Sequence, residues 1–153
     1  PNSEARNGKQ YDIRSFKVAK FSKGCAGNEI KGVGCVYQLP SYSPIKAGSD
    51  EMDKYDPKWN TTSWKGYVNY WAGAKKACEE QGMSLPDKSK LLSLAKKTTA
   101  EKEQLGLPTT YDYFWSSSEI HAIDATYVNF GGDGYTGTGY KNSSGVKVLC
   151  VGD

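Results

Sequence analysis

Three consecutive serines and the single histidine are the first residues that could carry out chemistry. Ser116, Ser117 and Ser118 lie shortly before His121. A serine hydrolase would need one of these serines beside the histidine base and an orienting carboxylate. The segment lacks the G-x-S-x-G sequence that presents a nucleophilic serine on a sharp turn. The residues indicate instead a polar strand whose hydroxyls bond locally, and we expect no catalytic residue in this chain.

Acidic side chains in the last third of the chain are the only candidates for a cation site. Calcium needs several converging oxygen ligands, and nothing in the spacing of the candidates brings them together. These residues are Asp112, Glu119, Asp124 and Asp133. The segment 131–134 (Gly-Gly-Asp-Gly) lacks the G-K-[ST] ending of a phosphate-binding loop. The sequence therefore predicts neither a metal site nor a bound cofactor.

Four cysteines are candidates for disulfide bonds: Cys25, Cys35, Cys78 and Cys150. Four cysteines allow three pairings, and the absence of a C-x-x-C pair argues against structural zinc. The glycine-rich segment between Cys25 and Cys35 could turn back and bring these two together, which would leave Cys78 and Cys150 to join a helix to the last strand. Four free thiols in a reducing cytosol are the alternative. Disulfides would place the protein outside the cytosol.

Length and composition narrow the class of protein. The 153 residues suit a single domain over 1–153, and residues 1–10 are polar and expected to be flexible. No run approaches the roughly 20 apolar residues of a membrane span, although a removed leader or anchor is left open. The net charge of +3 comes from scattered lysines, which is not the basic stripe of a nucleic-acid reader. Eleven Tyr, four Trp and four Phe with 17 Gly predict a loop-rich domain with an aromatic core.

The first half of the chain predicts strands, a long loop and then two helices. In residues 11–21 apolar side chains recur at every second position with one irregularity, which favours a strand with a bulge or two short strands. Residues 33–39 favour another strand. Residues 40–63 contain three prolines and are expected to be a loop. Residues 67–81 predict a helix that ends before Gly82, and Asp87 can cap a second helix. The spacing places these side chains on one face of the first helix: Tyr67, Tyr70, Trp71, Ala74 and Cys78.

The second half predicts strands and turns. Residues 113–117, 126–130 and 146–150 favour strands, and the alternation of the last segment suggests one buried face. Residues 131–145 contain six glycines and are expected to form turns or loops. Strand, two helices and several strands make an α+β pattern, with the terminal strands paired.

Several motifs together resemble the C-type-lectin-like fold of bacterial domains, over about residues 64–151. The C-terminal part has the form W-S-S-S-E, then A, V-N-F, G, K and V-x-C-V. The N-terminal part has an aromatic helix ending near a cysteine, followed by L-P and L-L-x-L. In this sequence the motif residues are Trp115 to Glu119, Ala125, Val128 to Phe130, Gly134, Lys141, Val148 to Val151, Tyr70 to Cys78, Leu85-Pro86 and Leu91 to Leu94.

The resemblance implies two small antiparallel sheets packed with two helices. It supports a disulfide between the cysteines of the first helix and the last strand, Cys78 and Cys150. It also implies that Glu119 is a structural residue that anchors backbone amides. The chain departs from calcium-dependent lectins, because it has Leu85-Pro86-Asp87 in place of an E-P-N or Q-P-D triplet and no W-N-D triplet near the end.

Some lectin-fold proteins are variable proteins of diversity-generating retroelements. Their randomised codons end in C or T and cannot encode Met, Gln, Lys, Glu or Trp. From Ile120 to Gly145, Lys141 is the only residue of these types. An ordinary glycine-rich loop would show the same bias, so both interpretations stay open.

The resemblance favours a non-catalytic recognition domain, extracellular or at a cell or virion surface, that binds a protein or glycan. The alternative is the head of a pilin-like or secreted filament subunit, and the sequence does not set the oligomeric state. Residues 111–145 form the candidate ligand-binding and variable region. We expect its contacts to include Ile120, His121, Ile123, Asp124, Thr126, Tyr127, Tyr135, Thr136, Thr138 and Tyr140.

Overall fold

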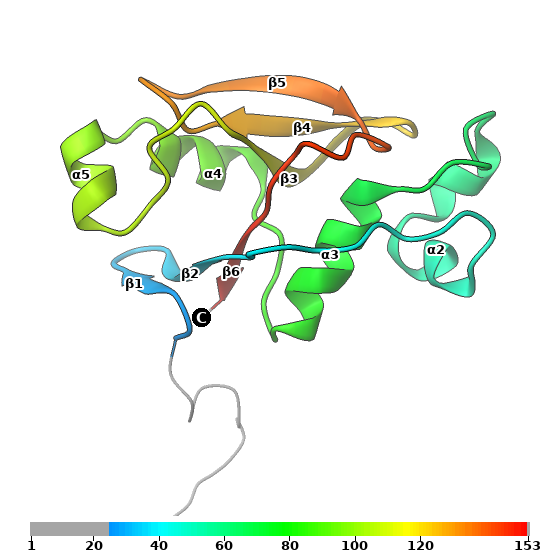
Figure 1. The fold of residues 1–153 in the computed structure, drawn as a ribbon, viewed down its shortest axis with the longest axis horizontal. Coiled ribbons are helices and arrows are strands. Elements are labelled where there is room, and N and C mark those ends of the chain that lie inside the picture. Colours follow the sequence, from blue (N-terminus) through cyan, green and yellow to red (C-terminus); the bar gives the residue numbers. More distant parts are fainter. Residues whose placement is uncertain (1–24, 153) are drawn as a thin grey trace, which may run out of the picture.

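The computed structural model describes residues 25–152 (Figure 1). The predictions for residues 1–10 and 11–21 lie outside this part of the chain. The described residues form four α-helices, a 3₁₀ helix and two small antiparallel sheets. The fold is α+β and lectin-like, as the sequence predicts. No helix within residues 25–152 is long and apolar enough to cross a membrane.

The first sheet joins segments from the two ends of the described chain. Its strands are β1 (Asn28–Ile30), β2 (Gly34–Gln38) and β6 (Leu149–Gly152), in the order β1-β2-β6. β2 confirms the strand predicted over 33–39, and its antiparallel register with β6 confirms the terminal pairing. The predicted one-sided alternation is wrong at the end, because Leu149 and Cys150 are both buried, in two different core clusters.

The first long helix begins later than predicted. α3 (Tyr70–Glu80) starts after Asn69, whose side-chain oxygen accepts a hydrogen bond from the Ala72 amide at 2.8 Å. This cap leaves Tyr67 outside the helix, where it is 59 % exposed, so its predicted place on the buried face is wrong. The end of the helix is as predicted, because Gly82 follows with a φ of 72°.

Two further helices follow α3. α4 (Lys88–Ala95) begins at Asp87, which accepts a hydrogen bond from the Lys90 amide at 2.8 Å, as predicted. α5 (Thr99–Gln104) was not anticipated. Its buried Lys102 donates to the carbonyl oxygens of Ala95, Phe130 and Gly132 at 3.0, 2.6 and 3.1 Å. This ammonium group ties the end of α4 to the turn between β4 and β5.

The loop predicted over 40–63 contains two short helices. α2 spans Asp50–Tyr55 and the 3₁₀ helix η2 spans Pro57–Thr61. Pro57 is the first residue of η2, a position that tolerates proline because its missing N–H would have no helical partner. Met52 and Trp59 from these helices are fully buried with Ile45 and Ala72. The three prolines therefore divide this segment without making it irregular.

The second sheet contains β3 (Tyr113–His121), β4 (Asp124–Asn129) and β5 (Tyr135–Tyr140) in that order. α4 lies against one face of this sheet (Figure 1). β5 corrects the prediction of loops over 131–145. A Cβ built on Gly137 would lie 2.7 Å from the Tyr127 ring, and one on Gly139 would lie 3.2 Å from it. The ring of Tyr127 therefore covers the glycines of the neighbouring strand and takes the place of their side chains.

Both disulfides inferred from the sequence are present. Cys25–Cys35 and Cys78–Cys150 have Cα–Cα distances of 5.6 and 5.4 Å. Cys78 and Cys150 lie in the core cluster of Trp71 and Trp115.

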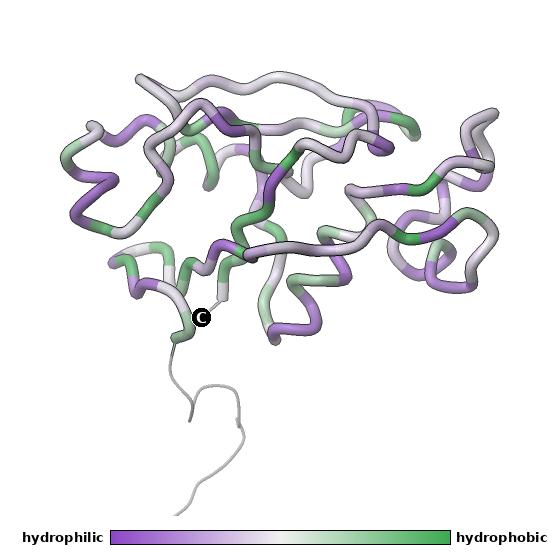
Figure 2. Tube along the Cα trace, viewed as in Figure 1, coloured by the Kyte–Doolittle hydropathy of each residue, from purple (hydrophilic) through white to green (hydrophobic). Residues whose placement is uncertain are grey.

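In Figure 2, β5 is pale along its length, which sets it apart from the strongly hydrophobic positions of the core. β5 is thus a strand of small and weakly polar residues on the outside of the second sheet.

Candidate ligand-binding surface

Tyrosines gather on one face of the second sheet. Tyr113 pairs with Asn129 across β3 and β4, and Asn129 pairs with Tyr135 across β4 and β5. Tyr127, two residues before Asn129, has its ring 4.3 Å from the ring of Tyr113. Paired and alternate residues share a face of a sheet, so these three side chains lie on the same side. Tyr111 lies over the glycines that follow β4. We call Tyr111, Tyr113, Tyr127 and Tyr135 the tyrosine face.

Three of the four side chains of the tyrosine face are exposed to solvent. Tyr111, Tyr113 and Tyr135 are 74, 38 and 49 % exposed, whereas Tyr127 is half-buried beneath them. A side-chain hydrogen bond with Tyr113 raises the pKa of Tyr135, together with burial and the other tyrosines nearby. Tyrosines offer large, rigid contact areas with a polar end, at a small cost in conformational entropy. This arrangement can bind a protein or glycan surface.

The contact residues expected from the sequence lie on different parts of the domain. Tyr127 and Tyr135 lie on the tyrosine face. Thr136 and Thr138 are exposed on β5 but alternate with Gly137 and Gly139, so they lie on the opposite face. Ile120 and His121 are exposed where β3 turns into β4, and His121 Nδ1 is 3.0 Å from Asp124 Oδ1.

Three members of the expected set are occupied elsewhere. Tyr140 stacks on Trp64 with ring centroids 4.8 Å apart, and Ile123 packs beside the buried cluster of α2 and η2. Thr126 is only 3 % exposed, which corrects its expected role in contacting a ligand. It lies in the central strand β4, and its carbonyl oxygen accepts a hydrogen bond from Ser116 Oγ.

Sequence reasoning missed Tyr111 and Tyr113. Tyr111, Tyr113 and the buried Trp115 occupy every second position. This spacing indicates one face of a strand and was the available signal. Without the pairing of β3 with β4, nothing in the sequence places them beside Tyr127.

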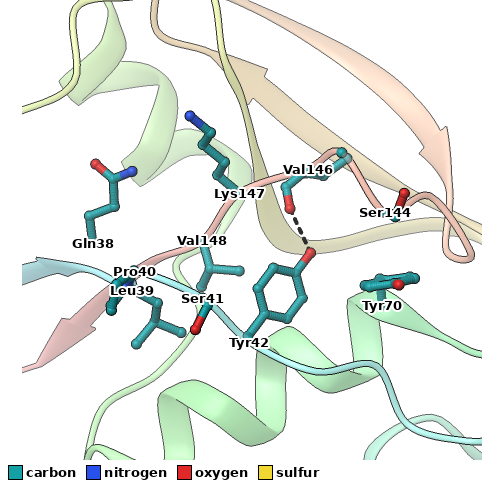
Figure 3. Close-up of a pocket in the computed structure, with 11 residues that line it drawn as sticks. Gln38, Leu39, Pro40, Ser41, Tyr42, Tyr70, Ser144, Val146, Lys147 and Val148 are labelled. Atoms are coloured by element: carbon teal, nitrogen blue, oxygen red, sulfur yellow. Dashed lines mark hydrogen bonds between the residues drawn. The ribbon is translucent and has the colours of Figure 1, made fainter.

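A groove of about 570 Å³ is lined by the residues drawn in Figure 3. Its walls are the segments 38–42 and 144–148, with Tyr70 at one end. The Lys147 amide donates to the Tyr113 carbonyl at 2.7 Å, so the 144–148 wall runs directly alongside β3. Tyr42 crosses the groove and donates its hydroxyl proton to the Val146 carbonyl oxygen at 2.6 Å. The groove therefore extends the candidate surface past the edge of the sheet.

Ionisation of Tyr42 makes the stability of the domain depend on pH in the alkaline range. Burial raises its pKa to about 12, against a lowering by the hydrogen bond from Trp115, and the nearby Tyr70 raises it further. An unfolded tyrosine ionises near pH 10, so the stabilisation linked to Tyr42 is complete below pH 10 and is lost as the pH rises through about 12. The shift corresponds to roughly 3 kcal/mol.

We therefore expect Tyr42→Phe to lose about 1–2 kcal/mol of unfolding free energy at neutral pH and to show a smaller decline at alkaline pH than the wild type. Urea unfolding between about pH 8 and about pH 12 measures both effects. Tyr111→Phe is the control, because Tyr111 is an exposed tyrosine without these bonds. Equal alkaline declines in Tyr42→Phe and wild type would contradict the assignment.

Glu119 does not have the role that the resemblance implies. It accepts hydrogen bonds from two lysine side chains instead of backbone amides: Lys141 Nζ at 2.6 Å and Lys58 Nζ at 3.3 Å. Burial opposes ionisation of Glu119, but the hydrogen bond and charge of Lys141 outweigh it and lower the pKa of the carboxyl. Glu119 therefore forms an ion pair inside the domain.

The residues considered for catalysis and metal binding have other partners. Ser116 Oγ accepts from the Ser118 amide, which is the local bonding expected, but it also donates to the Thr126 carbonyl, and Ser118 Oγ accepts from the distant Lys88 amide. Asp112 and Asp124 lie beside Lys147 and His121. Across residues 25–152, no group of three or more His, Cys, Asp or Glu side chains could hold a metal ion.

The fold and the two disulfides define a C-type-lectin-like domain. The sequence also matches a family model described as "Adhesion domain" (InvE_AD) over residues 16–151, and the chain belongs to this adhesion-domain family. A search of curated proteins finds no match to the chain. Disulfides and membership of an adhesion family are consistent with an extracellular or surface location.

Proposed function

We propose that this domain is a non-catalytic adhesin module that binds a protein or glycan on an extracellular surface through its tyrosine face. The observation that carries the proposal is the group of exposed tyrosines held over a floor of glycines and a buried tryptophan. Exposed aromatic side chains on a rigid scaffold are typical anchors of binding surfaces. Two disulfides cross-link the scaffold, so we expect it to lose little conformational entropy on binding.

The proposal includes sequence diversification of the region 120–145 by a retroelement. Two features support it. Ile120, His121 and the threonines of β5 are exposed, so their replacement would disturb little packing. Lys141, the single residue in this region that randomised codons cannot encode, is fully buried and ion-paired, as a constant framework residue should be. A near-copy of the coding segment beside a reverse transcriptase gene, differing at adenines, is the expected finding in the flanking DNA.

The binding surface can be tested with two alanine variants. Tyr113→Ala and Tyr135→Ala are each expected to weaken binding about 30-fold, because truncating an aromatic anchor typically removes about 2 kcal/mol. The labelled domain is first applied to a glycan array and an array of extracellular proteins, and the affinity for any bound member is then measured for each variant.

Tyr67→Ala is the control, since Tyr67 is also an exposed tyrosine and lies outside the tyrosine face. The control should bind as the wild type does. Binding that is lost in Tyr67→Ala and retained in Tyr113→Ala would assign the contact to the surface around Trp64 and Tyr140 instead.

A further inference from the structure

Lys141 is enclosed between two carboxylates inside the domain. Its side chain is fully buried, and Nζ lies 3.0 Å from Asp56 Oδ2 and 2.6 Å from Glu119 Oε2. The ring of Trp71 covers another side of the ammonium group, with its centroid 4.3 Å from Nζ. Asp56 is itself only 2 % exposed. An amine and a carboxyl fixed in contact away from water are the two reactants of an amide condensation, and fixed pairs react with very high effective concentrations.

Asn69 fixes the orientation of the Asp56 carboxyl. Its side-chain oxygen caps α3 by accepting from the Ala72 amide, so its Nδ2 group is directed at Asp56 Oδ2, 2.8 Å away. A preorganised N–H donor in this place can stabilise the negative charge that develops on Oδ2 when a nucleophile attacks Cγ. The helix cap thus serves a second purpose at the Lys141–Asp56 contact.

Glu119 supplies a proton carrier. Its Oε2 atom contacts Lys141 Nζ, and its side chain is 25 % exposed, so it touches both the buried amine and the solvent side of the cluster. A carboxylate within hydrogen-bond reach of an ammonium group can accept its proton and release it later in the same reaction.

We propose that Lys141 and Asp56 form an intramolecular isopeptide bond, with Glu119 as the catalytic residue. Glu119 takes a proton from Lys141 Nζ, and the neutral amine attacks Asp56 Cγ. The Nζ–Cγ bond forms and the Cγ–Oδ1 bond breaks. Nζ keeps one of its three protons, and the departing oxygen takes up the other two, one carried by Glu119 and one transferred from Nζ after the attack, and leaves as water. Asp56 Oδ2 becomes the amide oxygen and keeps its bond to Asn69. An ammonium and a carboxylate together contain every atom and charge of an amide and one water, so no other reactant is required.

The bond would join two regions that the disulfides leave unlinked. Asp56 lies between α2 and η2, and Lys141 follows β5, 85 residues further along the chain. The cross-link would fasten the α2–η2 segment to the second sheet and, unlike a disulfide, would survive reduction. This inference goes beyond the proposed function and does not depend on which ligand is bound.

Intact mass spectrometry of the reduced and denatured chain tests the proposal directly. The expected mass is that of the sequence less one water, and a protease digest should contain a branched peptide that joins Asp56 to Lys141. A chain with the full mass of its sequence overturns the proposal. A missing water located elsewhere, for example in a succinimide, overturns it equally, and the branched peptide distinguishes the two cases.

Variants test whether loss of water requires Lys141 and Glu119 or occurs at any lysine–carboxylate contact. Lys141→Arg and Glu119→Gln should both show the full mass. Lys147→Arg should still lose the water, since Lys147 is paired with Asp112 at 3.2 Å in an exposed contact that should not condense. Loss of water between Asp56 and Lys141 in Glu119→Gln would overturn the catalytic role of Glu119. Because the wild-type mass is decisive alone, the test does not require every variant to fold.

Discussion

Lys141→Met is expected to lower the free energy of unfolding by about 3–5 kcal/mol, the usual cost of leaving buried charges without their partner. Two carboxylates, Asp56 and Glu119, both contact Lys141 Nζ. Methionine is similar in volume and would fill the space beside Trp71, so the loss reports on charge more than on packing. Urea unfolding at neutral pH measures the change. The estimate includes only the loss of the ion pairs of Lys141 and not the loss of the isopeptide bond proposed above.

Lys147→Met is the matched control for this prediction. Lys147 also forms an ion pair, with Asp112 at 3.2 Å, but both side chains are partly exposed. Exposed pairs typically contribute less than about 1 kcal/mol. Equal losses in the two variants would mean that the burial of Lys141 has no energetic consequence, contrary to our expectation.

Replacement of both Cys78 and Cys150 by alanine is expected to cost roughly 4 kcal/mol. The bond closes a loop between residues 72 apart in the sequence, and this loop restricts the unfolded chain. Both cysteines are fully buried in the cluster of Trp71 and Trp115, so alanine also removes sulfur atoms from packed positions. Thermal and urea unfolding of the oxidised proteins measure the difference.

The second disulfide provides the comparison. Cys25 and Cys35 are only 10 residues apart, and the same relation gives roughly 3 kcal/mol for their removal. The order of the two effects is the test. A larger loss for the Cys25 and Cys35 double variant would contradict the dependence on loop length, and the contacts of the sulfur atoms could not explain it, because Cys78 and Cys150 are the more deeply buried pair.

Local signals in the sequence identified the elements that have strong periodicity and caps. α3 was predicted from Trp71, Ala74 and Cys78 at helical spacing, and its end from Gly82. The start was placed too early because Tyr67 continues the apolar spacing, although Asn69 begins the helix. Periodicity describes which residues could share a face, whereas the cap decides where the helix starts.

Elements that depend on distant partners could not be predicted in the same way. β5 is rich in glycine and resembles a loop until the Tyr127 ring covers Gly137 and Gly139. Thr126 was expected to contact a ligand because it lies in the candidate variable region 111–145, yet it belongs to the central strand β4 and is 3 % exposed. The sequence singled out Lys141 as a motif residue and for its codon type, but gave no sign of its contacts with Asp56 and Glu119, which lie 85 and 22 residues away in the chain.

The placement of Cys150 within β6 also has a mechanical consequence. An antiparallel strand pulled along its end can separate from its neighbour one hydrogen bond after another, which requires little force at any moment. Here tension applied at β6 would pass through the sulfur–sulfur bond into the last turn of α3, bypassing the backbone ladder with β2. A domain that holds a surface ligand under flow would thus carry load through its covalent frame, and β6 would keep its register until that frame yields.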